Sequence, residues 1–130
     1  MRTRLLTLNE YKSAKGESIT MLLGAAHWDM PVTENPVLGT VEIWCLINLT
    51  EDVHPIHLHL VCFQILDRRW FDKPHYFVKG ELKCIDPPLS PYHGEAGWKD
   101  TVRAHPEMVT RIITPFEGYP GRYVWHCHIL

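Results

Sequence analysis

The sequence predicts a single all-β domain, built as a sandwich or a barrel. Its 130 residues suit one domain, and a domain of this length can bury a core without covalent cross-links. Short runs of β-forming residues recur between glycine and proline turns. No helical period is sustained for three turns, and the chain contains neither an internal repeat nor a low-complexity segment. These features favour many short strands packed around one core.

The first part of the chain is expected to supply two strands and a long loop. Residues 4–8 and 18–23 are rich in β-forming residues, and residues 12–17, which include a glycine, form the turn between them. Residues 25–39 contain two prolines and end in a glycine, so we expect a loop there.

Residues 40–48 give the clearest strand signal. The two faces of this segment alternate, with Val41, Ile43, Cys45 and Ile47 on one and Glu42, Trp44, Leu46 and Asn48 on the other. Because both faces are largely apolar, we expect this strand at the centre of a sheet.

The rest of the chain predicts four more strands around a long irregular segment. Residues 56–66 are expected to form one strand. Residues 67–99 are rich in proline and glycine, and a loop of this length is usually functional or covers something. Strands are expected again at residues 101–104, 107–114 and 122–130.

Charge and hydropathy argue against two classes of partner. The formal net charge of −2 leaves no basic field for nucleic acid. No apolar run is long enough to span a membrane. The basic, apolar start of the chain is interrupted by Asn9 and Glu10, so we expect no signal peptide.

The distinctive feature of the sequence is the grouping of its metal-binding residues. Five of the nine histidines, together with one cysteine, lie in two short clusters, His54–His59 and His126–His128. The first cluster is at the start of a predicted strand, and the second is in the last predicted strand. Nothing else in the sequence concentrates nitrogen and sulfur donors in this way.

Strand geometry divides these donors between two faces. Side chains alternate with a period of two along a strand, so residues two apart share a face. If the two strands are neighbours, one face collects four imidazoles, those of His57, His59, His126 and His128. The opposite face collects His54 and Cys127, provided that the first strand extends back to His54. The sequence therefore predicts two metal sites joined through the backbone of residues 126–128.

The two faces differ in chemistry. Four imidazoles suit copper, zinc, iron or nickel. A thiolate with an imidazole becomes a blue-copper electron-transfer site when a second histidine and a weak axial thioether are added. Cys127, placed between two histidines, offers a short covalent route for an electron. Two alternatives are a zinc site that uses three or four of these ligands, and histidines that only pack in the fold.

The motifs of the chain resemble those of the multicopper oxidases, in particular the bacterial laccase group of spore coat protein A and bilirubin oxidase. The two copper motifs of that family match residues 54–60 and 123–130. Further similar stretches are residues 29–34, 39–44, 66–69, 97–101 and 121–123. The resemblance covers nearly the whole chain. It implies a Greek-key β-sandwich or barrel of cupredoxin type.

The resemblance also implies a place in a larger enzyme, a ligand set and a reaction. Residues 1–130 are expected to be the last (third) cupredoxin domain, truncated at both ends and incomplete at its C-terminus. His54 and Cys127 would bind type 1 copper, His57 type 2 copper, and His59, His126 and His128 type 3 copper. Cys127 and its flanking histidines would form the electron-transfer path. Phenolic or aromatic reductants would then give up single electrons, and O2 would be reduced to water.

The chain departs from the family pattern in two ways. The family's second type 1 histidine and its axial residue follow Cys127 at positions that this sequence does not include. The family's cluster also takes histidines from an N-terminal cupredoxin domain, which is missing here. We therefore expect the isolated chain to be inactive. Two alternatives are a stand-alone copper-binding cupredoxin that transfers electrons, and a cupin-like zinc or iron domain.

The remaining cysteines and histidines give weaker expectations. Cys45 and Cys62 lie in apolar runs and are expected to be buried thiols, whereas the state of Cys84 is open. The redox compartment is therefore undetermined, although the resemblance allows a spore-coat, cytoplasmic or cell-surface location. Four scattered histidines are expected on the surface or in loops: His27, His75, His93 and His105.

Overall fold

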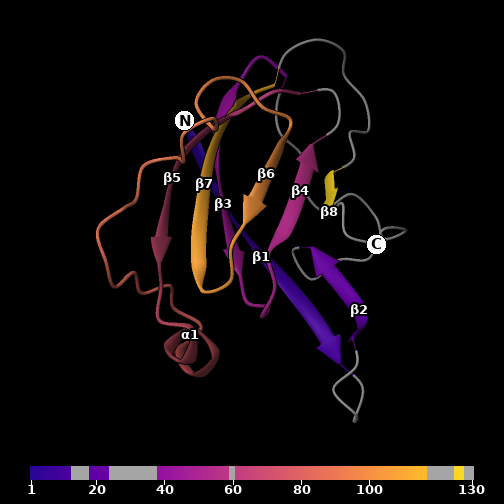
Figure 1. Cartoon of the computed structure of the whole chain (residues 1–130), viewed down its shortest axis with the longest axis vertical. Coiled ribbons are helices and arrows are strands. Elements are labelled where there is room, and N and C mark those ends of the chain that lie inside the picture. The colour runs from indigo at the N-terminus through magenta and orange to yellow at the C-terminus, as the bar shows by residue number, and fades with distance from the viewer. Residues whose placement is uncertain (13–17, 24–37, 59–60, 117–124, 128–130) are drawn as a thin grey trace.

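The computed structural model describes residues 1–12, 18–23, 38–58, 61–116 and 125–127, with the backbone alone at 10–12, 18–23 and 125–127. Its elements are β1 Arg2–Lys12, β2 Ser18–Leu23, β3 Val41–Asn48, β4 His54–Leu58, β5 Gln64–Trp70, α1 Lys73–Lys79, β6 Thr101–Ala104, β7 Met108–Pro115 and β8 Trp125–Cys127. The strands form a five-stranded sheet in the order β2-β1-β3-β7-β5 and a three-stranded sheet in the order β6-β4-β8 (Figure 1). This confirms the all-β prediction and the central place expected for residues 40–48.

From β3 onward, consecutive strands alternate between the two sheets. β3, β5 and β7 belong to the five-stranded sheet, whereas β4, β6 and β8 belong to the three-stranded sheet. Each connection therefore crosses from one sheet to the other, and strands far apart in the sequence become neighbours. In this way β4 comes to lie between β6 and β8, antiparallel to both.

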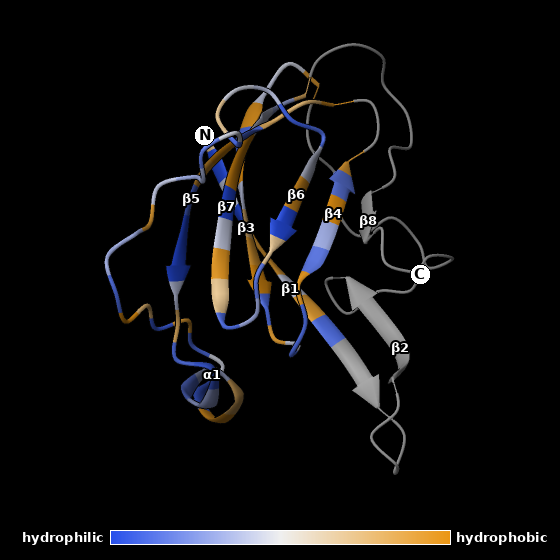
Figure 2. Ribbon diagram, in the orientation of Figure 1, coloured by the Kyte–Doolittle hydropathy of each residue, from blue (hydrophilic) through white to orange (hydrophobic). Residues whose placement is uncertain are grey.

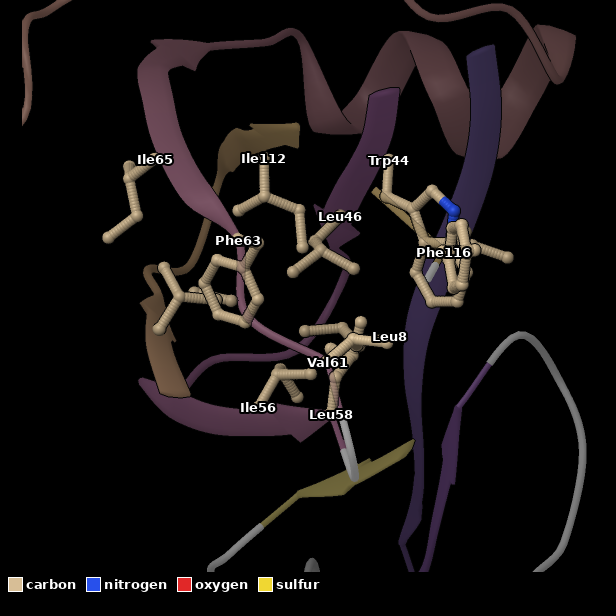
Figure 3. Close-up of a cluster of buried hydrophobic side chains, with 13 residues drawn as sticks. Leu8, Trp44, Leu46, Ile56, Leu58, Val61, Phe63, Ile65, Ile112 and Phe116 are labelled. Carbon is tan, nitrogen blue, oxygen red and sulfur yellow. The ribbon is translucent and has the colours of Figure 1, made fainter. Parts of the chain in front are cut away.

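Apolar side chains fill the space between the two sheets (Figure 3). The larger sheet contributes Leu8, Leu46 and Ile112, and the smaller sheet contributes Ile56. Phe63, which precedes β5, is fully buried in the same cluster. Full burial of one such side chain stabilises the fold by roughly 1.5–3 kcal/mol.

The prediction of one strand over residues 56–66 is wrong. The segment contains the end of β4 and the start of β5, which belong to different sheets. The run reads as one apolar segment because Val61 and Phe63, which lie where the chain crosses between the sheets, are themselves buried in the core. Cys62 lies in this crossing and is exposed, which corrects the expectation of a buried thiol, whereas Cys45 is buried as expected.

Residues 67–99 are less irregular than expected, because β5 continues to Trp70 and α1 follows. The Asp72 side chain accepts a 2.9 Å hydrogen bond from the His75 backbone N–H, which caps the start of α1. Gly80 ends the helix with a φ of 69°, a left-handed conformation that glycine adopts without strain. The helix escaped prediction because it buries none of its seven residues, so no apolar period marks it. Within the described residues, no helix is long and apolar enough to cross a membrane.

Replacing Asp72 with alanine should destabilise the fold by about 1 kcal/mol, because the first turn of α1 loses its capping acceptor. The free energy of unfolding, measured by urea titration, checks this. Asp86→Ala is the matched control, because this exposed side chain caps no helix. We expect the control to stay within about 0.5 kcal/mol of wild type. Equal losses in the two variants would contradict the capping role.

Two adjacent residues of β5 form bidentate ion pairs with different parts of the fold. Asp67 accepts hydrogen bonds of 2.8 and 2.5 Å from Arg111 of the neighbouring strand β7, within one sheet. Arg68 donates hydrogen bonds of 2.7 and 2.8 Å to Glu95, which belongs to the long loop between α1 and β6. Asp67 and Arg68 both belong to β5, which is largely hydrophilic in Figure 2.

Ion pairing lowers the pKa of two carboxyl groups. The Arg68 hydrogen bonds hold the pKa of Glu95 below its usual range and outweigh the opposing effect of partial burial. Burial alone raises the pKa of Glu42, but hydrogen bonds from Arg4 and Trp44 and the Arg4 charge bring its pKa below the usual range. Both groups are therefore more acidic in the folded chain than in the unfolded chain.

This shift predicts a pH-dependent difference between wild type and Glu95→Gln. A carboxyl group with a lowered folded-state pKa stabilises the fold above the unfolded-state pKa, and this contribution is lost as the pH falls through the folded-state value. We therefore expect wild type to be the more stable protein at pH 7, and the difference to shrink as the pH falls from about 5 to 3. Urea titrations over this range check this, and a constant difference would contradict it.

Candidate metal centre

The two strands that carry the histidine clusters are neighbours in the three-stranded sheet. His57 of β4 is paired with residue 126 of β8, and Ile56 is paired with residue 127. Opposite residues of an antiparallel pair lie on the same face, so positions 57 and 126 share one face and positions 56 and 127 share the other. The adjacency on which the two-face prediction depends is therefore present.

The described residues contain part of the predicted ligand set. β4 begins at His54, so the strand extends back as far as the prediction requires, and positions 54 and 56 share a face. His59 and His128 lie outside the described residues, as do the side chains of His126 and Cys127. Within the described part of the chain, no three His, Cys, Asp or Glu side chains form a metal-holding group by themselves. The convergence of the six ligands therefore stays a prediction.

His54 is fixed by a buried hydrogen-bond network. Its side chain is only 4% exposed, and its Nε2 lies 2.8 Å from the Thr50 hydroxyl oxygen. The Thr50 hydroxyl donates at 2.7 Å to Asn48 Oδ1, whose amide nitrogen donates to the carbonyls of Asp52 and Ala104 at 2.8 and 2.9 Å. The single Thr50 hydroxyl hydrogen has two oxygen acceptors, Asn48 Oδ1 and the Asp52 carbonyl, and this arrangement favours His54 Nε2 as the donor to Thr50. This pattern assigns the ring lone pair of neutral His54 to Nδ1.

The ring of His57 is held through Nδ1, whereas that of His54 is held through Nε2. Its Nδ1 lies 2.9 Å from the backbone oxygen of Asp100 and 3.2 Å from the Thr101 hydroxyl. A carbonyl oxygen only accepts, so Nδ1 must carry the proton, and the lone pair of the neutral ring is on Nε2. The two histidines of β4 thus present different ring nitrogens on opposite faces of the strand. This pattern suits two separate metal sites better than one.

These residues fit a copper centre. Metal-bound histidines typically donate their second ring N–H to a carbonyl or another acceptor, which fixes the tautomer and the ring orientation. His54 and His57 both make this kind of contact. The sequence adds a thiol and three further imidazoles in the same two strands, and imidazole and thiolate are the donors that copper accepts in electron-transfer proteins.

Sequence reasoning missed the residues that orient the two histidines. Thr50 and Asn48 lie close to His54 in the sequence but carry no recognisable spacing signal. Asp100 contacts His57 through its backbone oxygen rather than through its carboxylate. A backbone acceptor 43 positions away leaves no trace in residue types, so only the fold reveals it.

A β-sandwich domain whose histidine-bearing strands pair in one sheet is a candidate metalloprotein domain. The chain belongs to the multicopper oxidase family, whose model matches residues 4–130. The expected resemblance to bacterial laccase-type multicopper oxidases is thereby confirmed.

Individual relatives agree. The chain is 54% identical over 110 residues to a laccase of Bacillus subtilis, a match that covers 85% of this chain and 21% of that protein. It is 36% identical over 154 residues to the multicopper oxidase LPR2 of Arabidopsis thaliana, which covers 99% of this chain and 26% of that protein. The chain thus spans about a quarter of the length of these curated relatives.

Solved structures support the fold. A multicopper oxidase from Pediococcus acidilactici superimposes with a TM-score of 0.68 at 25% identity, over 98% of this chain and 23% of that chain. A blue copper oxidase from Nitrosomonas europaea superimposes with a TM-score of 0.67 at 19% identity, over 98% of this chain and 37% of that chain. These likenesses confirm the expected cupredoxin-type β-sandwich.

Proposed function

We propose that this chain is the last (third) cupredoxin domain of a laccase-type multicopper oxidase. In this proposal the complete enzyme oxidises phenolic or aromatic reductants one electron at a time and reduces O2 to water. The observation that carries the proposal is the pairing of β4 with β8, which sets His57 opposite residue 126 in a member of this family. The partners are the reductant, O2 and the N-terminal cupredoxin domains. The resemblance extends the proposal to a spore-coat, cytoplasmic or cell-surface location.

The proposed ligands follow the two faces of the β4–β8 pair. On one face His54 and Cys127 would hold type 1 copper. On the other face His57 would hold type 2 copper, and type 3 copper would be held by His59, His126 and His128. When bound, copper supplies the one-electron redox chemistry that accepts electrons from the reductant and delivers them to O2.

The protein's own contribution is orientation, exclusion of water and connection. Thr50 and the Asp100 carbonyl fix the rings of His54 and His57, so their ligand nitrogens need little rearrangement when a metal binds. The buried side chains of Ile56 and Leu58 keep water from the backbone between the two faces. Residues 126–128 are consecutive, so covalent bonds connect the donors proposed for the two faces.

The test is copper-dependent oxygen consumption with a phenolic substrate. The full-length protein encoded by the gene that contains this chain should consume O2 with copper bound and should lose this activity in Cys127→Ser. His75→Ala is the matched control, because His75 is on α1, outside the β4–β8 pair. Undiminished activity in Cys127→Ser would overturn the proposal.

The 130-residue chain alone should show little or no turnover after copper loading. It lacks the N-terminal histidines that the family uses to complete its cluster, so the proposed type 2 and type 3 ligands would be only partly assembled. The same oxygen electrode assay, run on the isolated chain beside the full-length protein, checks this. Robust oxygen consumption by the isolated chain would mean that neighbouring copies supply the missing ligands, or that they are not needed.

A further inference from the structure

We propose that Glu95, acting through Arg68, is a positioning residue for His57. Together, Glu95 and Arg68 hold in place the segment of residues 95–103. The Asp100 carbonyl in this segment fixes the His57 ring. This inference rests on the proposed function in one respect, because it treats His57 as a copper ligand.

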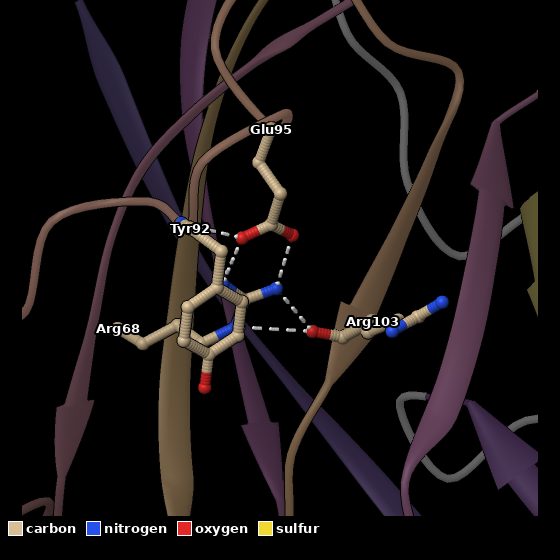
Figure 4. Close-up of polar contacts among 4 residues, drawn as sticks. All are labelled: Arg68, Tyr92, Glu95 and Arg103. Atoms are coloured by element: carbon tan, nitrogen blue, oxygen red, sulfur yellow. Dashed lines mark hydrogen bonds and ion pairs between the residues drawn. The ribbon is translucent and has the colours of Figure 1, made fainter.

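Arg68 lies where the two sheets meet the long loop between α1 and β6. Arg68 belongs to β5, the edge strand of the large sheet, and is only 2% exposed. Its guanidinium donates two hydrogen bonds to Glu95, and two more, of 3.2 and 2.8 Å, to the backbone oxygen of Arg103 (Figure 4). Arg103 belongs to β6, the edge strand of the small sheet. One guanidinium therefore joins the edges of both sheets to the long loop.

Glu95 is presented to Arg68 by a turn that begins at Tyr92. The backbone N–H of Glu95 donates to the Tyr92 carbonyl at 2.9 Å, and the Tyr92 N–H donates to the Glu95 carboxylate at 2.9 Å. The Tyr92 ring covers the guanidinium of Arg68, whose Cζ lies 4.9 Å from the centre of the ring (Figure 4). The turn is thus closed on itself and stacked on the ion pair, so loss of the carboxylate charge would weaken the attachment of the whole turn to Arg68.

The chain continues from this turn to Asp100, which contacts His57. Asp100 lies five residues after Glu95 and three residues before Arg103. Arg68 therefore forms hydrogen bonds with the chain on both sides of Asp100. Between these points the Asp100 carbonyl accepts the Leu58 N–H at 3.1 Å as well as His57 Nδ1. Asp100 is therefore joined to the two attachment points of Arg68 by short stretches of five and three residues.

A second contact pair keeps the same segment against the core. Lys99 and Phe63 exchange two backbone hydrogen bonds, each 2.8 Å long. Phe63 is buried between the sheets, so this pair ties the segment to an immobile point. Arg68 and Phe63 thus restrain the segment whose Asp100 carbonyl contacts His57 Nδ1. Partners that orient a metal-bound histidine typically change metal affinity 10–100-fold when they are lost.

The chain offers a matched control for a merely stabilising role. Asp67 is adjacent to Arg68 and forms an equally bidentate pair with Arg111, but that pair stays within the large sheet. Glu95→Gln and Asp67→Asn each remove one carboxylate charge from an ion pair of β5. Only Glu95→Gln should loosen the segment that holds His57.

The first measurement is amide hydrogen exchange in the 130-residue chain under native conditions. In Glu95→Gln we expect the amides of Leu58 and Lys99 to exchange roughly tenfold faster relative to the core amide of Leu46, the factor that matches loss of one charged hydrogen bond. In Asp67→Asn the ratio should stay at its wild-type value. Glu95→Asp, which keeps the charge, should restore part of the protection. Equal acceleration of all three amides would overturn the positioning role.

The second measurement is the type 2 copper signal of the copper-loaded full-length protein in electron paramagnetic resonance. Glu95→Gln should lower the affinity for this copper roughly tenfold or change its hyperfine splitting, and Asp67→Asn should do neither. If the amides of Leu58 and Lys99 exchanged faster in Glu95→Gln but its copper signal were unchanged, the link to the metal would be overturned. If His57→Ala left the type 2 copper signal unchanged, the proposed function would be overturned instead. The amide exchange ratio alone would then decide whether Glu95 positions His57.

Discussion

Arg68→Met should destabilise the fold by about 3–5 kcal/mol, because it removes the buried partner of a bidentate ion pair. The variant removes a guanidinium that is 2% exposed and leaves the Glu95 carboxylate, at 18% exposure, without its partner. It also removes both hydrogen bonds to the Arg103 carbonyl. The expected loss exceeds that of an exposed pair because the Arg68 guanidinium is itself withdrawn from water and binds the Arg103 carbonyl as well as Glu95. Urea unfolding at pH 7, followed by tryptophan fluorescence, measures the change.

Two further variants separate the charge from the packing. Arg111→Met breaks the neighbouring pair, but Arg111 is 41% exposed, so we expect a loss of about 1 kcal/mol or less. The double variant Arg68→Met/Glu95→Leu removes both charges and should be more stable than Arg68→Met alone. If Arg68→Met lowered the free energy of unfolding by less than about 1 kcal/mol, Arg68 would not be the connection between the two sheets that its contacts indicate.

The strands that the sequence predicted well are those whose neighbours do not change along their length. Residues 40–48 are apolar on both faces because β3 stays between β1 and β7 throughout. Residues 56–66 misled the prediction because the chain leaves one sheet and joins the other inside an apolar run. Local composition reports burial but not the identity of the sheet, so the crossing could not be recognised.

The histidines were recognisable because strand alternation is a local rule. Spacing alone placed His57 and His59 on one face, and the β4–β8 register agrees with the adjacency that this reasoning assumed. The groups that orient the ligands are different in kind. Glu95 is 27 positions from Arg68, and the Asp100 carbonyl is 43 positions from His57. Such contacts depend on how the strands alternate between sheets, which no spacing within one strand encodes.

The alternation also explains why a structural ion pair can influence a metal site. Because β5 and β6 belong to different sheets, the two edges need a connection other than backbone pairing, and Arg68 provides one. β6 is also the strand that lies beside β4, and its flanking residue Asp100 contacts His57. The connection between the sheets and the support of the ligand therefore use the same few residues.

Phe63→Ala should cost about 3–5 kcal/mol, because the ring is fully buried where the chain crosses between the sheets. Its neighbours Leu46, Ile56 and Ile112 come from three strands of the two sheets, so no single side chain can move to fill the space. Phe63→Leu keeps most of the volume and should cost less than about 1.5 kcal/mol. Both variants keep the backbone bonds to Lys99, so amide exchange at Lys99 should rise only in step with global unfolding. Urea titration and exchange on the same samples test both statements, and equal losses for alanine and leucine would mean that the ring does not fill the crossing.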